Sequence, residues 1–302
     1  MMGSVGGSVP GEQGLAVNRG HEGSLVFRCG RFCLELGRRT LVMGVLNLTP
    51  DSFSGDGIHG DPGRAVERAH ELVEAGADIL DIGGESTRPG SAIVDADLEL
   101  RRVVPVLERL GELSVPISVD TRRAAVAQAA LTAGASILND ISGLGEGPQL
   151  ASLVAGAGAG VVLMHMQGTP QDMQRDPHYE DVVGQVATFL AARARAAREA
   201  GIGPESIVLD PGIGFGKTLE HNLALLAHLD ALAEVGYPVL VGTSRKSFIG
   251  QLTGQPVETR LSGSLASVAV AIARGADIVR VHDVRETRQA VAVADAIVRG
   301  AR

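Results

Sequence analysis

The sequence predicts an α/β protein folded as a single (β/α)8 TIM barrel, and two observations carry this prediction. First, a unit made of a helix, a glycine and a short apolar strand recurs along the chain. Its copies lie at residues 74–82, 132–140, 157–165 and 274–282. Second, the strand parts are continuously apolar and rich in β-branched residues, as is typical of parallel strands buried on both faces.

Eight such strands follow the N-terminal region, with amphipathic helices between them. The strands are expected at residues 41–47, 78–83, 116–120, 136–140, 160–166, 207–210, 238–242 and 278–282. Helices are expected at residues 62–75, 97–110 and 181–200, the first with Asp61 as its N-cap. Eight βα units in about 260 residues fit the barrel, and a doubly wound sheet is the alternative architecture.

The region before the first barrel strand divides into two parts. Residues 1–23 are rich in glycine and serine and are expected to form a disordered tail. Residues 24–40 are expected to form a β-hairpin that turns near Gly30 and caps the bottom of the barrel. No shift in composition follows, so residues 24–302 are interpreted as one domain.

Composition and charge exclude several classes of protein. With 27 basic and 35 acidic residues the net charge is −8, whereas a nucleic-acid binder needs a basic face. No run of about 18 uncharged apolar residues is present, and the N-terminus lacks the apolar core of a signal peptide. The two cysteines, Cys29 and Cys33, are too few for a disulfide framework, and reduced thiols fit a cytoplasmic location.

The segment at residues 263–274 is apolar on nearly all sides of the helix that it is expected to form. An outer helix of a barrel needs only one apolar stripe, so the surplus predicts a homodimer interface. The alternative is extra contact with the hairpin or with the C-terminal helix.

Polar side chains follow nearly every expected strand. They are Asn47, Glu85, Asp120, Asn139, Asp140, His165, Asp210, Ser244, Arg245, Lys246, Arg280 and His282. Taken singly, an acidic residue after a strand is commonly a turn former or a helix cap. In barrels of this kind, however, the carboxyl ends of the strands carry the active site, so a series in register predicts a ligand site.

The predicted ligand follows from how these side chains sort by charge. Asp120, Asn139 and Asp210 can pair with the edge of a heterocycle that has adjacent N–H donors and acceptors. The basic group, made of Arg88, Arg245, Lys246, Arg280 and His282, suits phosphate oxygens. A flat polar ring carrying a phosphate is indicated, which leaves pterin, purine and flavin phosphates open.

Three glycine-rich loops lie at residues 83–90, 210–217 and 242–250 and permit close approach of backbone to a ligand. The spacing from Gly212 to Lys217 is one residue too short for a Walker loop. The chain has only two lysines, Lys217 and Lys246, and both lie in these loops. A structural role is expected for Lys217 and for His165, whereas the compact ammonium of Lys246 suits a ring oxygen.

Eight segments in order resemble the dihydropteroate synthase family. They are residues 43–54 (MGVLNLTPDSFS), 83–90 (GGESTRPG), 118–121 (SVDT), 139–142 (NDIS), 163–168 (LMHMQG), 210–217 (DPGIGFGK), 243–247 (TSRKS) and 280–284 (RVHDV). The resemblance runs from about residue 24 to the end of the chain. It implies a transferase of folate biosynthesis that condenses (7,8-dihydropterin-6-yl)methyl diphosphate with 4-aminobenzoate to give 7,8-dihydropteroate and pyrophosphate. It also implies an SN1-like path, Mg²⁺ as a cofactor that assists departure of the diphosphate, and sensitivity of the family to sulfonamides.

The resemblance also implies roles for individual residues. Asp120, Asp210, Lys246, Arg280 and His282 are the expected catalytic residues. Asn47 is expected to contact Mg²⁺, and the diphosphate is expected to be held by Thr87, Arg280 and His282. The edge of the pterin is expected to hydrogen-bond to Asp120, Asn139, Asp210 and Lys246, and its two faces to contact Met164 and Phe215. The aminobenzoate pocket is expected to be formed by Phe53, Arg88, Pro89, Lys246 and Ser247.

Two alternatives share the pterin-reading residues. A methyltransferase acting between methyltetrahydrofolate and a corrinoid would have no use for a cluster of diphosphate-binding residues. A non-catalytic pterin-binding paralogue is disfavoured because Asn47, Lys246, Arg280 and His282 are all present.

Overall fold

The computed structural model describes residues 25–49, 61–86, 91, 94–111 and 113–300. The expected tail, together with Phe53, Thr87, Arg88 and Pro89, therefore lies outside the described residues. Among the described helices, none combines the length and the hydropathy that crossing a lipid bilayer requires.

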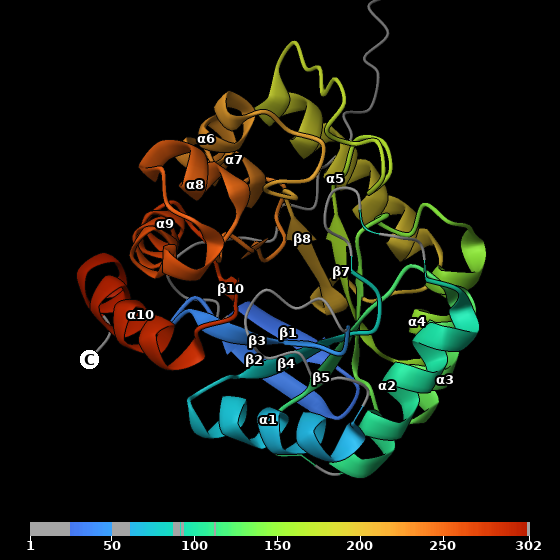
Figure 1. The fold of residues 1–302 in the computed structure, drawn as a ribbon. Coiled ribbons are helices and arrows are strands. Elements are labelled where there is room, and N and C mark those ends of the chain that lie inside the picture. The colour runs from blue at the N-terminus through green and yellow to red at the C-terminus, as the bar shows by residue number, and fades with distance from the viewer. Residues whose placement is uncertain (1–24, 50–60, 87–90, 92–93, 112, 301–302) are drawn as a thin grey trace, which may run out of the picture.

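Eight parallel strands form one sheet in the order β8-β7-β6-β5-β4-β3-β10-β9. The strands are β3 (Leu41–Asn47), β4 (Ile79–Gly83), β5 (Ile117–Asp120), β6 (Ile137–Asp140), β7 (Gly160–Met164), β8 (Ile207–Asp210), β9 (Leu240–Val241) and β10 (Ile278–Val281). A parallel bridge between Leu209 and Val239 joins the two ends of this order, so the sheet closes (Figure 1). The predicted (β/α)8 barrel is thus confirmed, and the doubly wound sheet is excluded.

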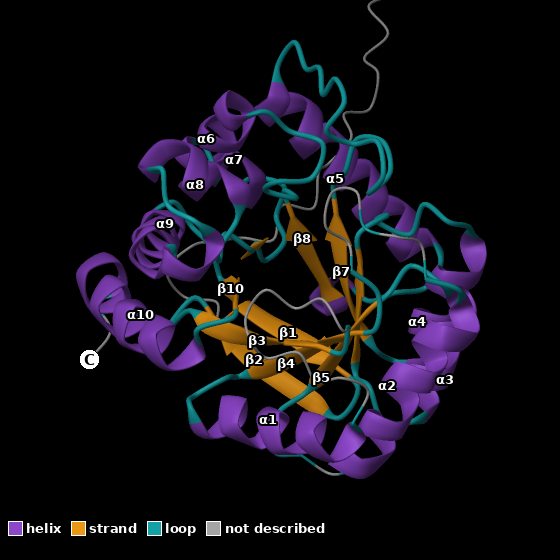
Figure 2. Cartoon of the chain, viewed as in Figure 1, coloured by secondary structure: helices purple, strands orange, loops and turns teal. Residues whose placement is uncertain are grey.

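Helices surround the sheet, as Figure 2 shows. They are α1 (Pro62–Glu74), α2 (Ala96–Leu110), α3 (Ala124–Thr132), α4 (Pro148–Ala157), α5 (Val182–Glu199), α6 (Leu219–Ala227), α7 (Asp230–Ala233), α8 (Ser247–Thr253), α9 (Leu261–Ala273) and α10 (Val284–Arg299), with 3-10 turns η1 (Pro204–Ser206) and η2 (Val257–Thr259). Asp61 caps α1 as predicted, because its side chain accepts a hydrogen bond from the amide of Gly63 at 2.8 Å. The largest difference in bounds is β9, which has two residues instead of five; Pro238 has no N–H to donate to a neighbouring strand.

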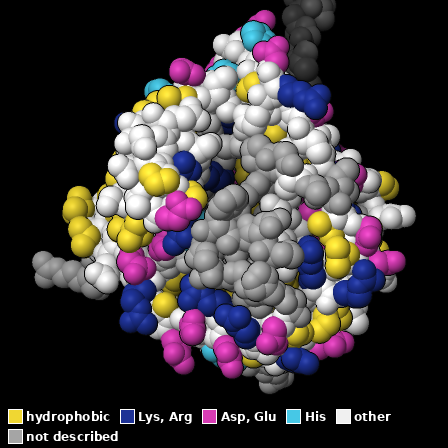
Figure 3. All heavy atoms as spheres, in the orientation of Figure 1, with side chains coloured by type: hydrophobic (Ala, Val, Ile, Leu, Met, Phe, Trp, Pro, Cys, Tyr) yellow, Lys and Arg dark blue, Asp and Glu magenta, His cyan; other side chains and the backbone are white. Residues whose placement is uncertain are grey.

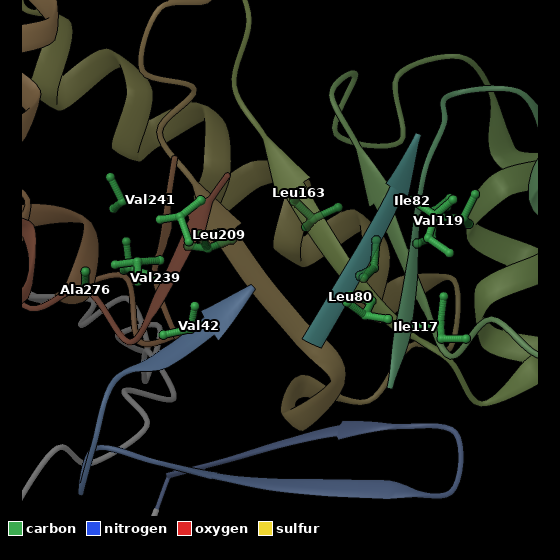
Figure 4. Close-up of a cluster of buried hydrophobic side chains, with 14 of the residues drawn as sticks. Val42, Leu80, Ile82, Ile117, Val119, Leu163, Leu209, Val239, Val241 and Ala276 are labelled. Atoms are coloured by element: carbon green, nitrogen blue, oxygen red, sulfur yellow. The ribbon is translucent and has the colours of Figure 1, made fainter. Parts of the chain in front are cut away.

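Two apolar clusters hold the barrel together. The larger lies between the strands and the helices, and Figure 4 shows part of it, including Leu80, Ile82, Val119 and Leu163. The smaller fills the lower interior of the barrel, and its strand members are Leu41, Met43, Ile79, Ile137, Val162, Val208, Leu240 and Ile278. Because side chains alternate along a strand, the next inward position lies two residues further on.

The N-terminal hairpin closes the bottom of the barrel. Strands β1 (Leu25–Cys29) and β2 (Phe32–Leu36) pair antiparallel, and Gly30 takes a φ of +57° in the turn between them. Phe27, Cys29 and Leu36 are buried in the smaller cluster. A Cβ on Gly160 would lie 2.5 Å from Cζ of Phe27, so glycine at this position lets the ring enter. The predicted hairpin and its place are confirmed.

Candidate active site

A polar layer lies directly above the apolar layer in the barrel interior. Two residues after the inward apolar residues of β4, β6, β8 and β10 stand Asp81, Asn139, Asp210 and Arg280. On β7 the equivalent position is the buried Met164. The alternation of the strands thus converts an apolar floor into a ring of charged and amide groups at the carboxyl ends of the strands.

Above this layer opens a cavity of about 450 Å³. Of the predicted site residues, seven line it: Asn47, Asp120, Phe215, Lys246, Ser247, Arg280 and His282. Asn139, Met164 and Asp210 are buried at the strand ends and are not among its lining residues. The cavity therefore brings together predicted residues from five different βα units.

Arg280 joins the acidic and basic parts of the site. Its Nε donates to Oδ2 of Asp81 at 2.6 Å, and its Nη2 donates to Oδ2 of Asp120 at 2.9 Å. Asp81 is fully buried and also accepts from Nδ2 of Asn139 at 3.2 Å. Three strands, β4, β6 and β10, are thus linked through one carboxylate, which sequence analysis missed.

The carboxyl of Asp120 has a raised pKa. Burial raises the pKa of its carboxyl to about 7, Arg280 opposes this rise, and the nearby Asp81 adds to it. Its Oδ1 is buried and has no hydrogen-bond partner among the described residues. A buried acceptor without a donor is costly, so this atom is suited to accept from a ligand N–H.

Lys246, in the loop after β9, and Asp210, at the end of β8, are close enough to influence each other electrostatically. The Lys246 Nζ donates to the carbonyl oxygen of Ile213 and lies 4.9 Å from the centre of the Phe215 ring. Burial lowers the pKa of Lys246 to about 8, an effect that Asp210 opposes. Burial also raises the pKa of Asp210, although Lys246 opposes this and the amide of Gly212 donates to its Oδ1 at 2.7 Å. A cation, a carboxylate and an aromatic ring thus lie near one another at this side of the site.

The loop before α8 is fixed from two sides. Arg245 takes a φ of +58° and pairs with Asp283, which places the following Lys246 and Ser247 at the cavity. Arg260 donates to the carbonyl oxygens of Arg245 and Lys246 at 3.1 and 3.4 Å. Nearby, Nδ1 of His282 lies 3.0 Å from Oγ of Ser244.

His165 and Lys217 lie behind the site instead of lining it. The buried Lys217 Nζ lies 3.0 Å from Nδ1 of His165 and donates to the carbonyl oxygens of His165 and Phe215. This pair ties the loop after β7 to the loop after β8, which carries Phe215.

Several residues of the site were not predicted from the sequence, for different reasons. Asp81 did carry a signal: it lies five residues after Gly76, just as Asn139 follows Gly134 and Arg280 follows Gly275 in the repeated unit. Met173, Val257 and Arg260 also line the cavity. Met173 lies in the long connection between β7 and α5, and the other two lie between α8 and α9, where the repeated unit has no counterpart.

The barrel and its ring of carboxylate, amide and cationic groups define the class of pterin-binding enzymes. Residues 43–282 match the profile of that family, described as pterin binding enzyme. The dihydropteroate synthase of Neisseria meningitidis serogroup C is 48% identical over 276 residues, which cover 90% of this chain and 97% of the relative. The dihydropteroate synthase of Synechocystis is 48% identical, and the match covers 89% of this chain and 93% of the relative.

Solved structures agree. The dihydropteroate synthase of Yersinia pestis in a sulfonamide drug complex has a TM-score of 0.86 at 45% identity, covering 92% of this chain and all of the other. That of Burkholderia cenocepacia complexed with 7,8-dihydropteroate has a TM-score of 0.83 at 46% identity, covering 92% and 98%. The chain belongs to the dihydropteroate synthase family, which makes it a transferase of folate biosynthesis and confirms the resemblance. The methyltransferase and the non-catalytic paralogue are not favoured.

Proposed function

We propose that the cavity condenses (7,8-dihydropterin-6-yl)methyl diphosphate with 4-aminobenzoate by an SN1-like path. The single observation that carries this mechanism is the Arg280–Asp120 contact of 2.9 Å. It places a guanidinium that suits diphosphate oxygens directly beside a carboxylate that suits the ring to which the diphosphate is attached.

The pterin ring takes the deep part of the site. Asp120, Asn139 and Asp210 offer acceptors to its N–H groups, and the ammonium of Lys246 serves its ring oxygen. Phe215 and Met164 supply the walls on either side of the ring. The buried Oδ1 of Asp120, which has no hydrogen-bond partner in the part of the chain that the structure describes, supports this placement.

The diphosphate takes the basic side of the site, next to Arg280 and His282, with Thr87 as a further contact. When the C–O bond between the pterin methylene and the diphosphate breaks, its electron pair leaves with pyrophosphate, whose growing charge Arg280 and His282 stabilise. The ring delocalises the resulting cation, and the carboxylates of Asp120 and Asp210 favour it. The neutral amine of 4-aminobenzoate then forms the C–N bond and releases a proton to solvent.

Mg²⁺ fits this site as a companion of the diphosphate. Asn47 lines the cavity and offers one amide oxygen, and no group of three metal-ligating side chains exists among the described residues. Mg²⁺ commonly uses few protein oxygens and completes its shell with phosphate and water. When bound, it neutralises charge on the leaving group.

The aminobenzoate pocket is proposed at the mouth, where Lys246 and Ser247 line the cavity. Phe53, Arg88 and Pro89 complete this proposal. A sulfonamide resembles aminobenzoate in shape, so we propose that sulfonamides compete at this pocket. The thiols of Cys29 and Cys33 are both free, which supports a cytoplasmic location.

We also propose a homodimer through α9 and α10. Val270 of α9 and Val293, Ile297 and Val298 of α10 are large apolar side chains exposed to solvent, with Ile297 79% exposed. In Figure 3, apolar side chains stand at the left edge of the molecule, where Figure 1 places α10. A patch of this kind favours a protein partner, and a second copy buries it symmetrically.

The catalytic proposal is tested by mixing both substrates and measuring pyrophosphate, with and without Mg²⁺. Release that requires both 4-aminobenzoate and Mg²⁺ is expected. Absence of any aminobenzoate-dependent release would overturn the proposed reaction, and release at the full rate in the presence of a chelator would overturn the role of Mg²⁺.

A further inference from the structure

Asp81 is a fully buried acidic residue of the site. It lies in the middle of β4, between Leu80 and Ile82, and its side chain is 0% exposed. Its Oδ2 accepts from Nε of Arg280 at 2.6 Å and from Nδ2 of Asn139 at 3.2 Å. Its Oδ1 is buried with no hydrogen-bond partner among the described residues.

Nothing in the packing of the barrel requires a charge at this place. The inward residue two positions earlier is Ile79, and the outward neighbours of Asp81 pack in an apolar cluster. Burying a carboxylate is costly, and an apolar side chain of similar volume would commonly be as stable or more so. The benefit of Asp81 therefore has to be sought in the groups that it contacts.

Both contacts of Asp81 are residues to which the proposed reaction assigns a ligand. We propose that Asp81 is a positioning residue of the condensation: it holds the guanidinium of Arg280 and the amide of Asn139 in the orientations in which they meet the pterin diphosphate. This inference rests on the proposed function and deepens it.

The geometry shows how each partner is oriented. The guanidinium of Arg280 donates through Nε to Asp81 and through Nη2 to Asp120. These two bonds fix the plane of the guanidinium and leave its remaining N–H groups for a ligand. An ionised carboxylate only accepts hydrogen bonds, so the amide nitrogen of Asn139 faces Asp81. The amide oxygen of Asn139 is thereby kept for a ring N–H.

The repeated unit explains why the three side chains meet. Asp81, Asn139 and Arg280 each stand five residues after the glycine that ends the preceding helix, at Gly76, Gly134 and Gly275. They therefore occupy one level of the barrel on three different strands. Asp120, on the adjacent β5, pairs in register with Gly83, two residues beyond Asp81, and its carboxylate contacts Arg280 from there.

The test compares Asp81→Asn with a matched control, Asp295→Asn. Asp295 is also buried and also accepts from an arginine Nε, that of Arg299 at 2.9 Å, but it lies at the bottom of the barrel and binds Thr40. Steady-state kinetics are measured for both substrates, pterin diphosphate affinity is measured by calorimetry, and thermal unfolding is followed for each variant. Asp81→Glu, which keeps the charge on a longer side chain, serves as a second variant.

Asp81→Asn is expected to weaken pterin diphosphate binding and to lower kcat, each by about tenfold or more, because it loses a charged hydrogen bond. The KM for 4-aminobenzoate should stay within about twofold of its original value. General destabilisation of the protein would not weaken the binding of one substrate and spare the other. Asp81→Glu should retain more activity than Asp81→Asn, and Asp295→Asn should keep the original kinetics.

Three outcomes overturn the inference. They are unchanged pterin diphosphate affinity in both Asp81 variants, equal losses for the two substrates, and equal kinetic losses in Asp295→Asn. If the unmodified protein shows no turnover, the proposed reaction fails, while the calorimetric comparison still decides whether Asp81 positions the pterin-binding groups.

Discussion

The ammonium of Lys217 lies 3.0 Å from Nδ1 of His165, and both side chains are buried behind the active site. The lysine has three acceptors, namely this ring nitrogen and the carbonyl oxygens of His165 and Phe215. These three partners bear no negative charge. The buried ammonium therefore joins the two loops but lowers the free energy of unfolding, by an amount that depends on pH.

The first prediction concerns the stability of this pair in alkali. Burial lowers the pKa of Lys217 to about 7, whereas in the unfolded chain it is near 10.5. Between these values the unfolded state binds more protons, so the free energy of unfolding rises with pH. Relative to Lys217→Met, the original protein should gain stability from pH 7 to pH 10 in urea titrations, and a parallel dependence in both proteins would contradict the assignment.

The same reasoning predicts sensitivity to acid. Burial, and then the charge of Lys217, lower the pKa of His165 to about 3 from its ordinary 6.5. Stability should therefore fall as the pH drops from about 6.5 toward 3, and His165→Gln should show a shallower fall. The comparison is made by urea unfolding at half-unit steps of pH.

Asp120 should govern the acid limb of activity. Because burial raises the pKa of this carboxyl to about 7, it should gain a proton just below neutral pH and lose the charge that we propose favours the pterin cation. The kcat/KM for pterin diphosphate is expected to fall tenfold per pH unit well below pH 7. Asp120→Asn should lower kcat/KM by about 100-fold and abolish this limb; a limb that survives the substitution would assign it to another group.

Arg123 should be essential for the stability of the loop after β4. It pairs bidentately with Glu85 and also with Glu99, whose side chain is 0% exposed. Arg123→Met should destabilise the protein by about 3 kcal/mol, because it leaves a buried carboxylate uncompensated. Adding Glu99→Gln should recover part of this loss, whereas Arg68→Met, in an exposed pair with Glu71, should cost less than about 1 kcal/mol. Guanidinium chloride unfolding measures all three.

Gly212 should tolerate no side chain. Its φ is +68°, and a Cβ there would lie 1.9 Å from the carbonyl oxygen of His165. Gly212→Ala should cost about 3 kcal/mol or more, since a left-handed conformation alone costs about 1–2 kcal/mol. Gly254→Ala provides the control, with a φ of +70° but open space around it, and thermal unfolding should show a much smaller loss.

The proposed dimer is tested on the exposed face of α10. Ile297→Glu places a charge on a side chain that is 79% exposed in the single chain and should therefore leave folding intact. Sedimentation at micromolar concentration should give a dimer for the original protein and a monomer for the variant. A monomer for the original protein would refute the proposal.

Most of the fold could be predicted because it follows a repeat. The glycine and the apolar strand recur with each unit, so each strand can be located from the residues around it. The same short segments also predict parallel pairing and the polar side chains at the carboxyl ends of the strands. The predicted length of β9 was too great, since Pro238 has no N–H to donate to a neighbouring strand.

The site was predictable in part for the same reason. Asp120, Lys246, Arg280 and His282 stand at strand ends or in the loops after them, and the barrel brings them to one cavity. Met173 and Arg260 reach that cavity from connections between elements, and the repeated unit does not determine the course of those connections. Asp81 was hidden because an acidic residue inside an apolar strand becomes informative only when the units are aligned on their glycines.

The floor formed by Phe27 and the apolar layer has a consequence for the sequence of events during turnover. With the barrel closed at that end, both substrates and both products pass through the mouth at the other. Because we propose that the pterin diphosphate lies deeper, we expect it to enter before 4-aminobenzoate. Titration of 4-aminobenzoate alone should therefore show no tight binding. A cavity with one opening thus imposes an order of substrate binding that the bond chemistry alone does not require.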